Sequence, residues 1–148
     1  MRFFKIFFAI FIFSTPLFAQ EGRGEWEPIF TEDSDKVYID VSGLSNFSGE
    51  DFYVWSLTEH SVPIIIESIS DKIYRTNTYY LFSKRLKKYS ILYIIYYDEN
   101  KNVLASFDYG RNSNVEVYQY NYPLMDGSVE KSIYDKCVEV INLANKNN

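Results

Sequence analysis

The single histidine of this 148-residue chain, His60, is the first residue that could carry acid–base chemistry. A hydroxyl nucleophile activated by a histidine and a carboxylate would need His60 as its base. Glu59 and Ser61 flank it, but neighbouring residues of a strand point to opposite faces, so they are badly placed to form such a relay. The sequence has no G-x-S-x-G nucleophile motif. We therefore expect a loop histidine and no enzyme. A catalytic role would need Asp or Glu partners from distant parts of the chain.

The acidic turn TEDSD, at residues 31–35, is the second candidate site. Two of its aspartates have the spacing that opens a calcium-binding loop. The later positions of such a loop fall on Val37, Tyr38 and Leu44, which cannot supply the remaining ligands or the glycine. Structural zinc sites take four ligands, mostly Cys and His, and the chain has one of each. We expect a solvated turn, no metal and no cofactor.

Cys137 is the only cysteine. It could be a reactive thiol, a metal ligand or one half of an intermolecular disulfide. Its place on the apolar stripe of an expected helix favours a fourth reading, because a free cysteine packs as a small hydrophobic residue. We therefore expect a buried, inert thiol.

The strongest positive run is KRLKK, at residues 84–88. Lys84, Arg85, Lys87 and Lys88 are the candidate partner-binding residues, able to contact acidic proteins, heparin-like polymers or lipid head groups. In a strand these charges would divide between two faces. The alternative, which we favour, is a solvated edge and turn that protects the sheet against aggregation.

Aromatic residues are abundant, and all 14 tyrosines lie beyond residue 19. Together with Trp26 and Trp55 they could form a stacking platform for sugars or bases. Aromatic residues at strand spacing more often pack in a core, and we expect that role here. Tyrosine also favours half-buried strands, so the composition predicts a protein rich in sheet.

Residues 1–19 have the three-part pattern of a secretory signal peptide. Arg2 and Lys5 form a positive region, an apolar run covers residues 6–13, and a small-residue cleavage site precedes Gln20. The apolar run is short for a membrane span, which needs about 20 residues. We expect cleavage and an exported protein located in the periplasm, on the outer membrane surface or outside the cell. The alternative is an uncleaved N-terminal anchor.

We expect a flexible leader at 20–25, a single domain at 26–148 and no membrane span after cleavage. After cleavage, 13 basic residues face 20 acidic ones, a net charge of −7. An acidic surface argues against general binding to nucleic acid or anionic membranes.

Hydrophobic alternation predicts a series of strands. Val37, Ile39 and Val41 share one face of their strand, and both faces of DFYVWSL are apolar, which indicates a central strand. The five polar residues DENKN, at 98–102, join the β-rich runs 89–98 and 103–109, which predicts a hairpin. Segment 62–69 is ambiguous between strand and helical turn, and irregular extended chain is the favoured reading. The expected strands cover residues 26–30, 36–41, 51–57, 78–86, 89–98, 103–109 and 115–122.

One helix follows the strands. Ser128 is the expected N-cap, and Glu130 in the first turn favours the positive end of the helix dipole. Apolar residues recur at helical spacing up to Ala144. Short connections favour an antiparallel meander, and the helix must bury its stripe on one sheet face. The predicted fold is α+β: a meander of about six strands with one C-terminal helix.

These residues resemble the bacterial surface-adhesin protein E family over roughly residues 24–143. That family has a Trp near the mature start, a Tyr-x-Asp strand, a Val-x-Trp-x-Leu-like strand, a hairpin with an acidic turn, and a Pro and a Ser before a Cys-bearing helix. The residues that match are Trp26, Tyr38, Asp40, Val54, Trp55, Leu57, Tyr97, Asp98, Pro123, Ser128 and Cys137.

The resemblance implies a sheet with a C-terminal helix held on it, surface display, and binding to host extracellular proteins. It also implies a disulfide from the helix cysteine to a cysteine early in the long strand, where this chain has Ser83 or Lys84. The second Trp of the family is replaced by Tyr118. We expect an exported, non-enzymatic binding domain with a protein partner. The alternative is a periplasmic accessory protein without a host ligand, and homodimerisation is compatible with either.

Overall fold

The structure is a computed structural model that describes residues 24–31, 34–110 and 122–146. The expected signal peptide, most of the leader and nearly all of the expected strand at 115–122 lie outside the described residues.

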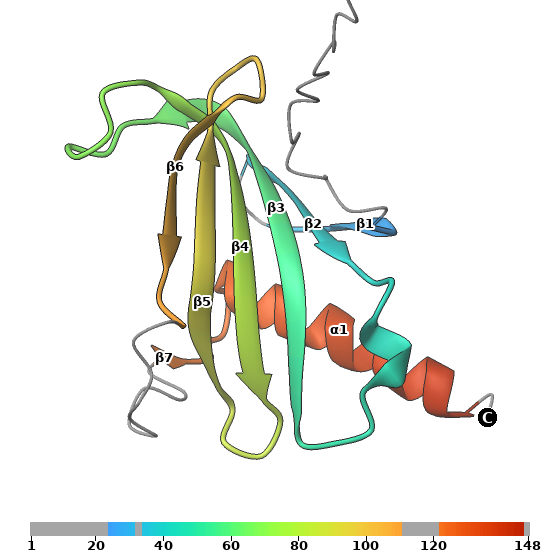
Figure 1. Cartoon of the computed structure of the whole chain (residues 1–148). Helices are drawn as coiled ribbons and strands as arrows, with labels where there is room; N and C mark the ends of the chain where they lie inside the picture. The colour runs from blue at the N-terminus through green and yellow to red at the C-terminus, as the bar shows by residue number, and fades with distance from the viewer. Residues whose placement is uncertain (1–23, 32–33, 111–121, 147–148) are drawn as a thin grey trace, which may run out of the picture.

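The fold is α+β: an antiparallel sheet with six strands in meander order and one C-terminal helix, as predicted (Figure 1). Each of the strands β1 to β6 pairs with its neighbour in the chain, and the short β7 pairs with the start of β5. The strands are β1 (Trp26–Ile29), β2 (Lys36–Asp40), β3 (Asp51–Ile64), β4 (Ile73–Ser83), β5 (Lys88–Tyr97), β6 (Val103–Asp108) and β7 (Tyr122–Pro123), and the helices are a 3-10 turn (Leu44–Asn46) and α1 (Val129–Lys146).

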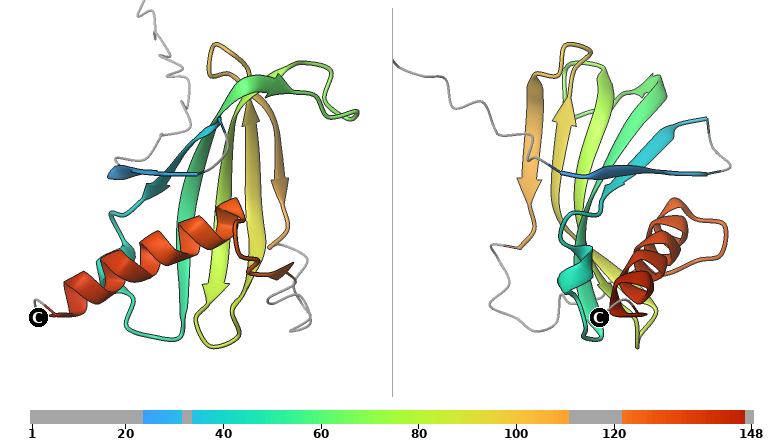
Figure 2. Two further views of the ribbon diagram at one scale, coloured as in Figure 1. Left: turned by 180° about the vertical axis from the view of Figure 1, so that it is seen from behind. Right: turned by 90° about the vertical axis from the view of Figure 1, so that its right-hand side faces the viewer.

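Helix α1 lies on one face of the sheet, across the end that holds the β4–β5 turn (Figure 2). Strand β1 curls over the same side, and Lys136 of α1 forms a 3.3 Å ion pair with Glu27 of β1. Ser128 caps the helix, because its hydroxyl accepts the Lys131 N–H at 3.1 Å. The predicted N-cap is thus confirmed. Gly127, with φ +82°, makes the turn into the helix in a conformation that favours glycine.

The core fills the space between α1 and the sheet. Phe52 of β3, Phe82 of β4 and Tyr134 of α1 form a ring cluster with centroids 5.3 to 5.9 Å apart. Burying a side chain of this size contributes about 1.5–3 kcal/mol relative to leaving it in water. The other buried core residues are Val37, Ile39, Val41, Leu44, Val54, Tyr80, Ile133, Cys137 and Ile141.

The predicted face assignments are confirmed for β2 and β3. Val37 and Ile39 are buried, and β3 is an interior strand between β2 and β4. The hairpin of β5 and β6 is also as predicted. Most residues of β5 are only half-buried, because the single helix crosses only part of one sheet face.

Three predicted boundaries were wrong. β3 runs through His60 and Pro63 to Ile64, where a stop was expected. Its register with β4 breaks after Glu59 and resumes at Ile64, so Pro63, which has no N–H, falls inside the break and removes no ladder bond.

Strand β4 spans Ile73–Ser83 rather than 78–86. The chain turns after Ser83, where the Lys87 N–H donates to the Ser83 carbonyl at 3.1 Å and Lys87 takes a φ of +52°. At the N-terminus β1 begins at Trp26, as predicted, and backbone pairing extends one residue further. The Val41 N–H donates to the Glu25 carbonyl at 2.8 Å, and Asp40 accepts the Glu25 N–H at 3.1 Å.

Candidate functional site

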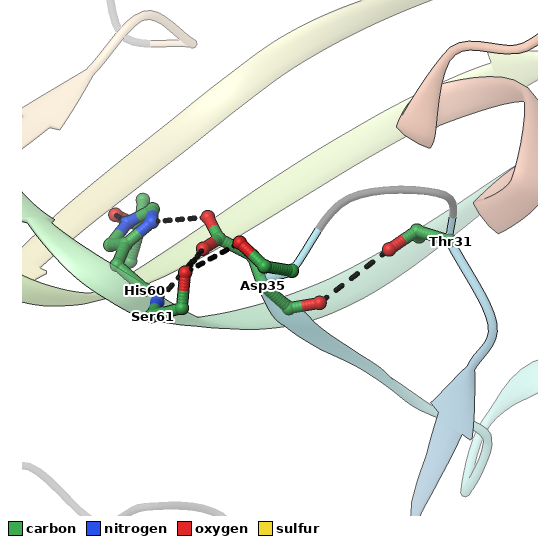
Figure 3. Close-up of polar contacts among 6 residues, drawn as sticks. Thr31, Asp35, His60 and Ser61 are labelled. Atoms are coloured by element: carbon green, nitrogen blue, oxygen red, sulfur yellow. Dashed lines mark hydrogen bonds and ion pairs between the residues drawn. The ribbon is translucent and has the colours of Figure 1, made fainter.

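A polar relay brings together side chains from three distant segments (Figure 3). His60 Nδ1 lies 2.8 Å from Asp35 Oδ2, and its Nε2 lies 2.8 Å from Thr76 Oγ1. An ionised Asp35 can only accept, so Nδ1 carries the proton and, in the neutral ring, Nε2 accepts the Thr76 hydroxyl. We call Asp35, His60, Ser61 and Thr76 the His60 cluster. Its order of hydroxyl, imidazole and carboxylate is that of a nucleophilic relay.

Ser61 completes the cluster through Asp35. Its N–H donates to Asp35 Oδ1 at 2.8 Å, its hydroxyl donates to the same oxygen at 3.1 Å, and its Oγ lies 2.7 Å from that of Ser34. Burial by itself would raise the pKa of Asp35. The hydrogen bonds from the Ser61 N–H, from His60 and from the Ser61 hydroxyl outweigh it and hold the pKa below its usual value.

The cluster corrects two sequence-based predictions. His60 is a strand residue with a side chain only 10% exposed, not a loop histidine. Asp35 belongs to this network and is therefore more than a solvated turn residue. The prediction that Glu59 and Ser61 form no relay with His60 is confirmed. The Ser61 hydroxyl donates to Asp35 and not to His60, and Glu59 forms a 2.8 Å ion pair with Arg75.

The surroundings of Thr76 do not favour acyl transfer. A developing oxyanion needs N–H donors aimed at it from above the nucleophile. Thr76 lies inside an interior strand, opposite Thr58 on one side and Tyr96 on the other. Backbone N–H groups of such a strand lie in the plane of the sheet and not toward its faces. The arrangement therefore supplies hydrogen bonds that tie the β1–β2 turn to β3 and β4.

The opposite face of the sheet carries a stack of aromatic rings. Tyr79 lies between Tyr53, with centroids 5.9 Å apart, and Trp55, with centroids 4.8 Å apart, and both pairs are within 24° of parallel. Tyr93 meets Trp55 edge-on at 6.1 Å. We call Tyr53, Trp55, Tyr79 and Tyr93 the aromatic stack. Alternation places it on the face away from Phe52 and α1.

The distances decide what this stack presents to a ligand. Coplanar rings lying side by side cannot approach to 4.8 Å, so Tyr79 and Trp55 stand face to face. The faces of Tyr79 are therefore turned toward its neighbours, and the surface offers ring edges and hydroxyl tips. Burial, with a contribution from nearby Tyr53, raises the pKa of Tyr79. Of the four residues, Tyr53 is the most exposed, at 40%.

The candidate partner-binding residues lie at the β4–β5 turn, and the structure divides them. Lys87 is engaged within the protein: its Nζ donates to the Tyr134 hydroxyl at 2.8 Å and lies 4.9 Å from the ring centroid. Arg85 and Lys88 are exposed, and Lys84 is half-buried. Residues 84–87 thus form a solvated turn, as favoured, but Lys88 begins β5, and the turn joins two interior strands and not a sheet edge. Three of the four cations are available to a partner.

Cys137 is buried and free, as predicted. Burial raises the pKa of its thiol to about 12. The position equivalent to the family's second cysteine does not face it. Ser83 follows Phe82, which packs against α1, so alternation directs the Ser83 side chain to the other face. Lys84 lies in the turn.

Sequence reasoning missed Asp35 and Thr76 as partners of His60. Its expectation that the tyrosines pack in the core is correct for Tyr80 and Tyr134 and wrong for the aromatic stack. The described residues contain no group of three or more His, Cys, Asp or Glu side chains placed to hold a metal ion. Within the same residues, no helix has the length and apolar character needed to cross a membrane. Comparisons of the chain with protein-family models, curated proteins and solved structures gave no match.

Proposed function

We propose that this chain is an exported, non-enzymatic domain that binds a protein partner through the aromatic stack. The observation that carries the proposal is the face-to-face packing of Tyr53, Tyr79 and Trp55 on the sheet face away from α1. The signal-like residues 1–19 support export to the periplasm, the outer membrane surface or the medium.

The geometry of the stack favours a protein over a sugar or a nucleic acid. Sugars and bases stack on exposed ring faces, whereas here Tyr79 has its faces toward Tyr53 and Trp55. The negative net charge further disfavours nucleic acid. Rigid Tyr and Trp side chains with polar tips are typical of the central residues of protein interfaces, because little conformational entropy is lost on binding.

The basic turn is a proposed second contact. Arg85, Lys88 and Lys84 would steer an acidic region of the partner, since exposed charges affect association rate more than final affinity. Glu50 and Asp51 adjoin the turn, because Lys84 N–H donates to the Glu50 carbonyl and Asp51 pairs with Ser83. These carboxylates weaken the local positive field, so we assign the turn the smaller role.

The partner's location separates two versions of the proposal. The resemblance to surface-adhesin protein E implies a host extracellular protein. An envelope accessory protein with only bacterial partners is the alternative, and the orientation of Ser83 favours it. The resemblance implies a disulfide to the position of Ser83, and that position does not face Cys137.

The binding surface is tested with Tyr53→Lys, which places a charge on the stack without creating a core cavity. We expect at least tenfold weaker binding to immobilised extracellular-matrix proteins, or to an envelope extract, than for the unchanged protein. Phe30→Lys is the matched control, because Phe30 is 95% exposed and lies outside the stack. Equal binding by both variants, with folding verified by circular dichroism, would remove the stack from the proposal.

Labelling intact and lysed cells with an impermeant amine reagent tests the location. Labelling of intact cells supports the adhesin version, and protection until lysis supports the periplasmic one. Recovery in the cytoplasm with residues 1–19 still attached would contradict both.

A further inference from the structure

The two outer strands of the sheet differ in how they present their backbones. Among the strands that the structure describes, β1 and β6 each pair with a single neighbour. The Val41 N–H donates to the Glu25 carbonyl beside β1, and the Tyr109 N–H donates to the Leu92 carbonyl beside β6. In an antiparallel pair every second residue turns its backbone groups toward the neighbouring strand, and the residues between them turn theirs outward. These two bonds therefore identify the outward residues of each edge.

Strand β1 is closed to a further strand. Glu25 and Glu27 face β2, so Pro28 is an outward residue, and it has no N–H to offer. Glu27 is also held to α1 by its ion pair with Lys136. A proline on the outward side and a length of only four residues are common protections of a sheet edge.

Strand β6 lacks this protection. From Tyr109 the register with β5 continues without a shift to Ala105, so Phe107 faces β5 and Ser106 turns its N–H and C=O outward. Residues 103–107 contain no proline and no charge, and Ser106 is exposed. An edge with these properties is a template for pairing with another extended chain.

The side chains of β6 determine which chain fits. Phe107 packs edge-on against Tyr96 at 6.0 Å and is still 37% exposed. The register places it on the α1 side of the sheet, although α1 crosses the other end (Figure 2). Ala105 on the same side is small, so an apolar side chain of an added strand can lie over Ala105 against the ring. Ser106 makes the opposite side polar, and the fitting strand therefore alternates apolar and polar residues.

A bulge in β6 decides between a second copy and a different protein. Ala105 pairs with Tyr96 and Val103 pairs with Tyr97, so Leu104 is an extra residue and the regular edge ends at Ala105. Two β6 strands related by a twofold axis would run antiparallel and meet this bulge twice, once at each end. A peptide from another protein meets it only once. The edge therefore favours a peptide over a second copy.

We infer that the outer edge of β6 is a strand-addition site for an extended peptide segment of another protein, with alternating apolar and polar residues. Backbone hydrogen bonds to Ser106 supply affinity, and contact with Phe107 selects the apolar residue. The site does not include the aromatic stack, so this inference does not rest on the proposed function.

The test uses isotope-labelled protein recovered after export, as the host processes it, and a short peptide of alternating valine and threonine with a lysine at each end. N-methylation of the valines leaves only one edge of the peptide able to pair and keeps it from forming sheets of its own. This peptide should shift the amide resonances of Ser106 and Phe107. A control peptide methylated on valine and threonine alike should shift neither, and equal shifts from both peptides would overturn the inference.

A pair of variants tests the same edge from the protein side. Ser106→Pro gives β6 the protection that Pro28 gives β1, and it should lower the affinity for the peptide at least fivefold. It removes no bond to β5, because the Ser106 N–H points outward. Ser106→Thr keeps the N–H and is the matched control, with an affinity within twofold of the unchanged protein. Equal binding by the two variants, with folding verified by circular dichroism, would contradict the site.

Hydrogen exchange of the free protein tests whether the edge is open. The Ser106 amide should exchange fast and the Phe107 amide, which faces β5, slowly; adding the peptide should slow exchange at Ser106. Protection of Ser106 in the free monomer would overturn the inference, because another part of the chain would already occupy the edge. So would protection that rises with protein concentration, because a second copy would then be the occupant.

Discussion

The two faces of the central strands carry similar numbers of aromatic rings and use them in opposite ways. Phe52 is fully buried beneath α1, while Tyr53, the next residue, is 40% exposed on the open face. On β4, likewise, Phe82 packs against Tyr134 of α1, and Tyr79 stacks on Trp55 on the open face. On β3 and β4 the covered face holds Phe52, Phe82 and Tyr80, whereas the rings of the open face are tyrosine and tryptophan, whose polar tips can meet water. On these two strands phenylalanine is therefore found only on the packed face.

The largest effect should come from breaking the covered face. Phe82→Ala removes a ring that contacts Phe52 and Tyr134 and leaves a cavity, and should lower the free energy of unfolding by about 3–5 kcal/mol. Urea denaturation measures the change. The solvent-exposed control Phe30→Ala should stay within about 0.5 kcal/mol. A cost below about 1 kcal/mol for Phe82→Ala would mean that α1 does not pack there as described.

On the open face the same kind of truncation should cost less. Trp55→Ala loses its stacking on Tyr79 and part of its burial, and we expect about 1–2 kcal/mol by urea denaturation. If Trp55→Ala costs as much as Phe82→Ala, and the cost rises with protein concentration, then a second copy covers the open face in solution.

Asp35→Asn should have a smaller effect that depends on pH. The folded pKa of Asp35 lies below 3.8, so its contribution is present above about pH 5 and is lost as pH falls through the folded pKa. At pH 7 we expect a loss of up to about 1 kcal/mol, limited by partial exposure. In stability measurements from pH 7 downward, the difference between the two proteins should shrink as pH approaches the folded pKa. A constant difference across this range would show that the carboxylate charge is irrelevant.

For Cys137 the expected effect is on reactivity and not on stability: its thiol should react far more slowly in the folded protein than in the unfolded protein. With its pKa raised to about 12 by burial, the thiol should resist a disulfide reagent at pH 8 in the native protein. One equivalent should react after unfolding in denaturant. Rapid native labelling, or a disulfide-linked dimer on a non-reducing gel, would contradict the burial.

The strands were predictable wherever one face is packed, because alternation then specifies burial residue by residue, as at Val37 and Ile39. The helix was predictable from Ser128 and its apolar stripe. The His60 cluster was not, because Asp35 and Thr76 lie 25 and 16 positions from His60 and meet it only through the sheet register. The end of β3 was predicted too early, because a proline normally interrupts the hydrogen bonding of a strand. Pro63 does not do so here, since it lies where the pairing with β4 is already broken.

The meander order has a consequence for how the chain reaches its native state. Sequential hairpins make mainly short-range contacts, so β1 to β6 can pair in order as the chain emerges from a ribosome or a secretion channel. The face that carries Phe52 and Phe82, however, stays uncovered until α1 arrives, because α1 (Val129–Lys146) follows all the described strands in the chain. Throughout that interval the half-finished sheet exposes its most apolar surface. Holding this surface apart from other chains is then a task for chaperones rather than for the fold itself.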